Sequence, residues 1–230
     1  MAKVSSSSLI RCLAALTRDA GFHGCHIAAW IAIKRPDRVR GIICASPGFV
    51  IEPKSNREPV HELMYLYKEL KAGPQGVNAP LTSELLEGAA SYFIGSDPRL
   101  DQRRHDFKRA LELRYGAGHS DNDFLKIFSW IDREPIPAGK LATVRAPVLI
   151  LAGTADQFVS PLAAAYEWQK AFANARGGAD VRQIAGAPTL MRCALLPHAL
   201  SLPRANVARC SYTDPNIVSR FILQFCSRHQ

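Results

Sequence analysis

The sequence predicts an α/β protein in which a parallel sheet is interrupted by a helical insertion. Two short apolar runs, residues 39–44 and 146–153, are rich in β-branched side chains and end in turn residues, which is typical of buried parallel strands. Helical patterns alternate with these runs, and that order favours parallel pairing. Residues 51–137 show helical patterns only, so we expect them to form an insertion between two parts of the sheet.

The first part of the chain predicts two helices and one strand. Leu9, Leu13 and Leu16 recur at helical spacing, which indicates an amphipathic helix over residues 8–19. Residues 26–34 are apolar almost all round, so this second helix should be buried against a sheet. Pro36 ends that helix, and the strand at residues 39–44 follows.

The middle of the chain predicts four helices and the last part completes the sheet. The four helices span residues 58–72, 82–94, 101–115 and 121–131. After the strand at residues 146–153, we expect a helix, a further strand and a terminal helix, at residues 161–173, 180–184 and 215–225. The predicted domains are therefore a core formed by residues 1–50 and 138–230, and a helical cap formed by residues 51–137.

Length and composition favour one globular domain, with or without a small subdomain. The chain has 230 residues, of which 47% are hydrophobic and 21% charged, which argues against a disordered chain. The net charge is +9, but the basic residues are scattered and no nucleic-acid motif is present, so we expect no nucleic-acid partner. No window is apolar enough to span a bilayer, so we expect no membrane partner and a cytoplasmic location.

Six cysteines occur without a CxxC pair and without metal-type spacing to histidine. We therefore expect free thiols in a reducing compartment, no metal site and no cofactor.

Two blocks of the sequence resemble the α/β-hydrolase family. Residues 21–30 (GFHGCHIAAW) and 35–42 (RPDRVRGI) are similar to its nucleophile elbow, the helix that follows and the next strand. Residues 141–161, which contain the run VLILAGTAD, resemble the strand that delivers the acid of the catalytic triad. The resemblance covers residues 20–50 and 141–225, and the helical middle matches only as a generic cap.

The resemblance implies positions for the three triad members. In this family a nucleophile stands on a strained strand-to-helix turn, and a carboxylate orients the histidine that activates it. Asp156 occupies the acid position, although a helix cap or an Asx-turn would also explain an aspartate there. The nucleophile position falls at Phe22, with Gly24 as a flanking glycine, or at His23 if the alignment shifts by one residue. Neither side chain replaces a serine.

The base histidine and the strands before the elbow also depart from the family pattern. The histidine is expected just after Pro188, where this chain has Thr189, and His198 is the nearest downstream candidate, unless it is a solvated loop residue. About twenty residues precede the elbow, so we expect a truncated sheet whose open edge favours self-association. Residues 189–213 fit the pattern poorly and represent either an inserted lid or, as we favour, an altered transcript or gene model that also affects residues 1–20.

Two functional hypotheses follow for a small-molecule substrate or ligand. The first is hydrolysis of an ester or related bond in a small apolar substrate, where Cys25 and Ser46 are nearby nucleophiles better explained as structural. A cofactor-free acid–base reaction through His23, Asp156 or His198 is a variant of this hypothesis. The second is a catalytically impaired or truncated relative, a pseudoenzyme that serves as a binding or interaction protein or is an inactive fragment.

Overall fold

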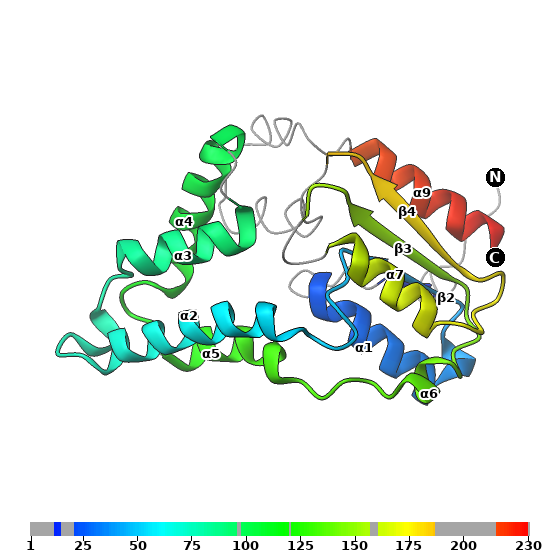
Figure 1. Ribbon diagram of the computed structural model, residues 1–230, viewed down its shortest axis with the longest axis horizontal. Coiled ribbons are helices and arrows are strands. Elements are labelled where there is room, and N and C mark those ends of the chain that lie inside the picture. Colours follow the sequence, from blue (N-terminus) through cyan, green and yellow to red (C-terminus); the bar gives the residue numbers. More distant parts are fainter. Residues whose placement is uncertain are drawn as a thin grey trace, which may run out of the picture. The chain divides into compact units, whose positions relative to one another are not determined.

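The computed structural model describes residues 12–14, 21–95, 98–119, 121–156, 161–186 and 215–229. Residue contacts divide the chain into two units (Figure 1). The sheet unit consists of Met1–Ile51 and Pro135–Gln230, and the helical unit consists of Glu52–Glu134. Whether the helical unit acts as a cap stays a prediction.

A parallel sheet forms the centre of the sheet unit, and the described residues contribute four strands to it, three of which the sequence predicts. The strands lie in the order β1-β2-β3-β4, and every neighbouring pair is parallel. Their bounds are β1 (Cys12–Ala14), β2 (Gly41–Ala45), β3 (Val148–Gly153) and β4 (Ala179–Ile184). Every residue of β2 and β3 is buried, which explains why the sequence shows these strands as continuous apolar runs and not as alternating patterns.

The helix predicted over residues 8–19 is wrong at residues 12–14, which form β1 instead. Cys12 lies opposite Gly41, and Ala14 lies opposite Ile43. A three-residue apolar segment fits the periodicity of a helix as well as that of a strand. The hydrogen bonds to β2 that make it a strand are non-local, so the local sequence pattern did not indicate them. β1 directly precedes the next helix along the chain. It therefore occupies the place of the strand that leads into the elbow, which we expected to be missing. The rest of the predicted helix lies outside the described residues.

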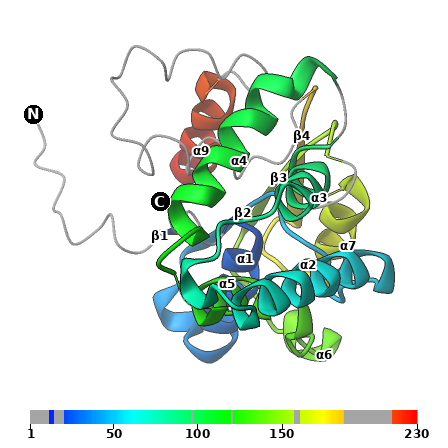
Figure 2. The same cartoon turned by 90° about the vertical axis from the view of Figure 1, so that its left-hand side faces the viewer.

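Helices cover both faces of the sheet (Figure 2). On one face α1 (Gly21–Lys34) and α7 (Leu162–Ala171) pack against alternate strand residues such as Ile42 and Ile150. On the other face α9 (Pro215–Arg228) brings Phe225 against Ile43, Leu149 and Leu151. This alternation follows from the two-residue period of a strand.

Close packing explains the glycine at the start of β2. A Cβ at Gly41 would lie 3.0 Å from Cε1 of Phe225, so a larger residue there would push α9 away from the sheet. The short helices of the sheet unit are η2 (Pro36–Arg38) and α6 (Ala138–Leu141).

The described residues of the helical unit form four α-helices, close to the four that the sequence predicts. They are α2 (Lys54–Ala72), α3 (Ser83–Ile94), α4 (Asp101–Tyr115) and α5 (Asp121–Phe128), with the short helices η3 (Gly76–Asn78), η4 (Pro98–Leu100) and η5 (Ser129–Asp132). The bounds of α4 are those predicted. α2 starts four residues before the prediction, and the last predicted helix ends at Phe128, where a 3-10 turn takes over.

Aromatic rings form the centre of the helical unit. Tyr67 stacks on Phe124 with ring centroids 4.1 Å apart, and Tyr115 meets Phe124 edge to face at 5.4 Å. Phe124 also packs against Phe128 at 4.5 Å. These contacts join α2, α4 and α5, because offset and edge-to-face ring pairs are favourable in a buried setting.

A buried lysine adds a polar anchor to this aromatic core. Lys71 Nζ donates hydrogen bonds to the carbonyl oxygens of Val77, Ala79 and Gly116, at 3.1, 2.8 and 2.9 Å. Its ammonium group also lies 5.5 Å from the centroid of the Tyr67 ring. Burial lowers the pKa of Lys71 below its usual value, because desolvation disfavours the charged form.

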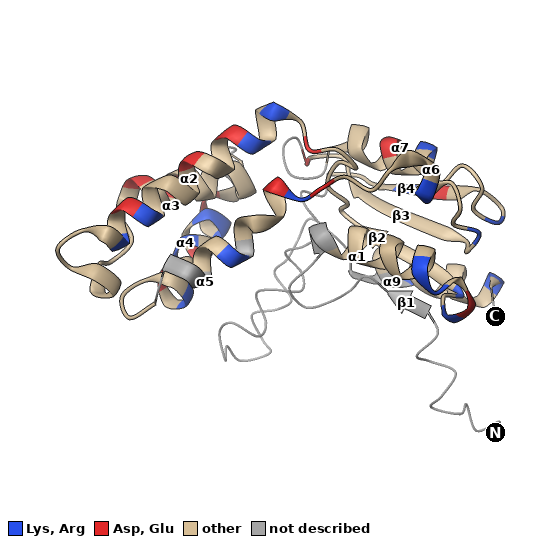
Figure 3. Ribbon diagram, turned by 90° about the horizontal axis from the view of Figure 1, so that it is seen from below, with Lys and Arg blue, Asp and Glu red and all other residues tan. Residues whose placement is uncertain are grey.

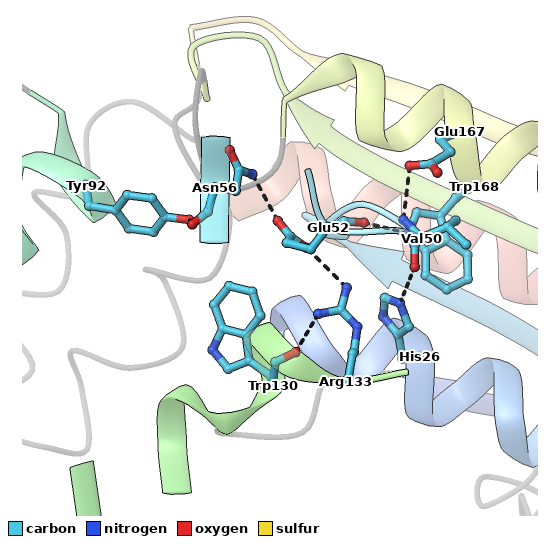
Figure 4. Close-up of polar contacts among 10 residues, drawn as sticks. His26, Val50, Glu52, Asn56, Tyr92, Trp130, Arg133, Glu167 and Trp168 are labelled. Atoms are coloured by element: carbon cyan, nitrogen blue, oxygen red, sulfur yellow. Dashed lines mark hydrogen bonds and ion pairs between the residues drawn. The ribbon is translucent and has the colours of Figure 1, made fainter. Parts of the chain in front are cut away.

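A second polar anchor joins the two ends of the helical unit. The buried carboxylate of Glu52 accepts hydrogen bonds from Arg133 Nη2 at 3.2 Å and from Asn56 Nδ2 at 2.9 Å (Figure 4). Arg133 Nη1 also donates to the Trp130 carbonyl oxygen at 3.0 Å. Glu52 is the first residue of the unit and Arg133 is the last but one, so this ion pair ties the entering and leaving chain segments together.

Candidate functional site

The carboxyl edge of the sheet carries the candidate site. In a parallel sheet all strands end on the same edge, and the loops that follow them lie close together there. In this chain that edge is formed by the ends of the strands at Ala14, Ala45, Gly153 and Ile184. Asp156, Phe22, His23 and Gly24 all come shortly after one of these strand ends.

Asp156 lies three residues beyond the end of β3 and is only 7% exposed. The turn between them is fixed to the end of β4, since Thr154 N donates to the Ile184 carbonyl oxygen at 3.1 Å and Thr154 Oγ1 accepts from Gly186 N at 2.8 Å. Pro161 is the N-cap of α7, so Asp156 does not cap this helix. The Asx-turn alternative stays open.

Phe22, His23 and Gly24 all lie in the first turn of α1, which directly follows β1 in the element order. The helix N-terminus therefore occupies the strand-to-helix position that the family resemblance assigns to the nucleophile. Gly24 is buried, while the side chains of Phe22 and His23 are outside the described atoms.

His198, Thr189 and the whole of residues 187–214 lie outside the described residues. The candidate base histidine therefore stays a prediction. Among the described residues no group of three or more histidine, cysteine, aspartate or glutamate side chains could hold a metal ion. Likewise, no described helix is long and apolar enough to cross a membrane.

The loop after β2 begins with a residue in an uncommon backbone conformation. Ser46 has φ 49°, in the left-handed region, and its side chain is fully buried. Ser46 N donates to the Leu151 carbonyl oxygen of β3 at 2.8 Å. Non-glycine residues rarely adopt this conformation, and it persists only where the surrounding structure fixes it.

Three side chains from two helices hold the rest of this loop (Figure 4). Trp168 Nε1 donates to the Gly48 carbonyl oxygen at 2.6 Å, and the Glu167 carboxylate accepts from Val50 N at 3.0 Å. His26 Nε2 lies 3.4 Å from the Val50 carbonyl oxygen, and its ring meets Trp168 edge to face at 4.7 Å. The loop is thus fixed to α1 and α7 by buried contacts.

The sequence analysis missed these loop-holding residues because their partners are far away in the chain. His26 and Trp168 lie within helical apolar patterns that predict core positions, and nothing local indicates that each also has a polar partner. The thiols of Cys25 and Cys44 are both fully buried. A buried thiol of this kind is inert toward substrate.

Comparison with known proteins identifies the fold. No protein-family model matches the chain, and no curated protein matches it. Solved structures do: MenH from S. aureus has a TM-score of 0.56 and 16% identity, and a thermophilic esterase from Thermogutta terrifontis has 0.55 and 13%. MGS-M2, an alpha/beta hydrolase enzyme from a Medee basin deep-sea metagenome library, has 0.52 and 12%.

The matches cover 91%, 91% and 80% of this chain, respectively, but only 66%, 64% and 59% of those proteins. The chain therefore has the α/β-hydrolase fold and spans less than two thirds of the length of these structural neighbours. At such low identity the likeness shows the fold and leaves the chemistry open.

Proposed function

We propose that this chain is a catalytically impaired α/β-hydrolase relative that binds a small apolar ligand at the carboxyl edge of its sheet. The observation that carries the proposal is the placement of Phe22 in the first turn of α1, next along the chain to β1. This fold needs a nucleophile at that strand-to-helix position, and a phenylalanine offers apolar contact area without reactivity.

The surroundings support binding because they are fixed in place. The loop after β2 is held by Trp168, Glu167 and His26, and the turn before Asp156 is hydrogen-bonded to the end of β4. A pre-formed site binds a ligand with a smaller entropic cost than a mobile one.

A second candidate function is hydrolysis of an ester or related bond, and Asp156 favours it. Its carboxylate is buried directly after β3, where the fold places the acid of the triad. An enzyme of this kind would use Asp156 to orient the base histidine, and the nucleophile would come from a residue other than Phe22.

A panel of p-nitrophenyl esters with short to medium acyl chains distinguishes the two functions. We expect no p-nitrophenolate release above the rate without protein. Turnover that Asp156→Asn abolishes and Asp180→Asn leaves unchanged would establish the hydrolase instead. Asp180 is the matched control because it is an aspartate of the same sheet, paired with Arg182 at 2.9 Å.

Binding has its own readout, the midpoint of thermal unfolding with and without p-nitrophenyl butyrate. A ligand that binds only the folded chain raises this midpoint. We expect the rise to be lost in Phe22→Ala and kept in Phe107→Ala, which removes the same ring from the helical unit. A midpoint that the ester leaves unchanged in the wild type would contradict the binding proposal.

A further inference from the structure

The amino edge of the sheet, opposite the candidate site, carries a concentration of arginines. Arg40, Arg145 and Arg176 lie just before β2, β3 and β4, and Arg228 ends α9. All four side chains are exposed. Figure 3 shows several blue Lys and Arg segments at the end of the sheet unit where the C-terminus lies.

Two cavities open at this edge and share part of their lining. The larger, of about 450 Å³, is lined by Arg176, Arg182, Arg228 and His229. The smaller, of about 350 Å³, is lined by Arg40, Arg145, Arg176 and His229. Arg176 and His229 belong to both, so the two cavities adjoin. Arg176 N also donates to the Arg145 carbonyl oxygen at 3.1 Å, which brings these two loops together.

Most of the positive charge here is not neutralised by neighbouring side chains. Within the described part of the chain, Arg40, Arg145, Arg176 and Arg228 form no ion pair. The acidic residues nearby are already engaged: Asp180 pairs with Arg182 at 2.9 Å, and Asp37 lies 3.6 Å from Arg35. Guanidinium groups with unused donors match the geometry of phosphate oxygens.

The same cavities also have apolar walls. Phe221, which is half-buried, lines the larger cavity together with the buried Val148 and Phe225, and the buried Val39 and Pro147 line the smaller one. Gly177 and Gly178, at φ 76° and 81°, form the turn at the mouth of the larger cavity, and no atom lies within 4 Å of where their Cβ atoms would be. Glycines without side chains allow a ligand to approach the backbone closely.

The partial negative charges of the helix ends at this edge disfavour an anion, but they are smaller than the positive charge of the arginines. α1, α7 and α9 all have their C-termini here, and each carries a partial charge of about −0.5. Lys34, Lys170 and Arg228 in the last turns offset those charges. Arg40, Arg145 and Arg176 lie outside the helices, so their charge stays available to a ligand.

We propose that the two adjoining cavities bind a small phosphate monoester with an apolar group. The phosphate lies between Arg145 and Arg176, and the apolar group lies along the half-buried ring of Phe221 in the larger cavity. Arginine pairs bind phosphate oxygens through two parallel hydrogen bonds, and the apolar walls add affinity that inorganic phosphate alone lacks.

Calorimetric titration at fixed ionic strength tests this proposal with phenyl phosphate, inorganic phosphate, phenol and a single-stranded oligonucleotide. We expect saturable one-to-one binding of phenyl phosphate, weaker binding of inorganic phosphate and no binding of phenol. The double variant Arg145→Gln/Arg176→Gln should weaken phenyl phosphate binding by about tenfold or more. Arg57→Gln/Arg109→Gln, which removes two exposed arginines from the helical unit, should change it by less than about twofold.

Three outcomes would overturn the proposal. The first is an equal loss of phenyl phosphate affinity in both double variants, and the second is the absence of phenyl phosphate binding. The third is oligonucleotide binding that falls steeply with salt and that both double variants weaken equally, because this result would indicate a general effect of net charge. If the glutamine pair fails to fold, Arg145→Lys/Arg176→Lys keeps the charge but loses the planar fork. This pair should then show an intermediate loss.

Discussion

The sheet unit and the helical unit are stabilised in different ways. The sheet unit is built around the buried apolar strands β2 and β3, with one hydrophobic cluster on each face of the sheet. The helical unit combines an aromatic core with buried charged groups, Lys71 and the Glu52–Arg133 pair. The packing of apolar strands can be predicted from local sequence patterns, whereas the contacts of the buried charged groups depend on partners that are distant in sequence.

The largest effect is expected from Trp168 in the sheet unit. Trp168→Ala removes a fully buried ring and the hydrogen bond to the Gly48 carbonyl oxygen, and should lower the free energy of unfolding by about 3–5 kcal/mol. Chemical denaturation followed by circular dichroism measures the loss. Trp168→Phe keeps an aromatic ring and should lose clearly less. Equal losses in the two variants would show that ring packing contributes little beside the hydrogen bond.

A smaller effect is expected from the lysine anchor of the helical unit. Lys71→Met keeps the aliphatic stem but removes the three hydrogen bonds that the ammonium group donates, including the one to the Ala79 carbonyl oxygen, which should cost about 1–3 kcal/mol. Lys68→Met, one turn earlier on the exposed side of α2, is the matched control. Hydrogen exchange should show the loss of protection in the helical unit. Unchanged protection in Lys71→Met would mean that the aromatic core alone stabilises this unit.

The smallest effect concerns acid pH and the surface ion pairs of the helical unit. Hydrogen bonding from Lys108 lowers the pKa of Glu87, desolvation partly opposes this, and Arg104, at 2.7 Å, adds to the lowering. A carboxylate with a depressed pKa stabilises the fold above its unfolded pKa, and this contribution is lost as pH falls through the folded pKa.

Glu87→Gln should therefore be less stable than the wild type near pH 7, and the two should converge at acid pH below both pKa values. Thermal unfolding midpoints measured across that pH range check the expectation. Glu84→Gln, an exposed glutamate in the first turn of the same helix, serves as the control. A constant difference between wild type and Glu87→Gln at every pH would argue against the charged interaction.

The same contrast explains how much of the fold the sequence predicted. β2, β3 and β4 and the helices α1, α4 and α7 follow from apolar runs and periodicity, and the structure places them within a few residues of the expected bounds. β1 was missed because three apolar residues carry no distinct period, and its pairing with β2 joins segments about thirty residues apart.

The candidate site was predicted only in outline. Asp156 was chosen because it follows the clearest strand in the sequence, and its role stays a prediction, whereas α1 was placed by its apolar run. The contacts of His26, Glu167 and Trp168 with the loop after β2 could not be predicted, since each joins residues 24 to 120 positions apart. The left-handed backbone conformation of Ser46 could not be predicted from the sequence either, because serine is common in ordinary turns.

We propose that Asp156 holds the acid position of this hydrolase fold while Phe22 stands where a reactive nucleophile would be needed. Intact-mass measurement after incubation with a serine-directed fluorophosphonate tests it most directly, because an activated serine forms a stable covalent adduct. We predict that the mass of the chain stays unchanged. A stoichiometric adduct that maps to a single serine, and that Asp156→Asn prevents, would contradict the claim and identify the chain as an active hydrolase.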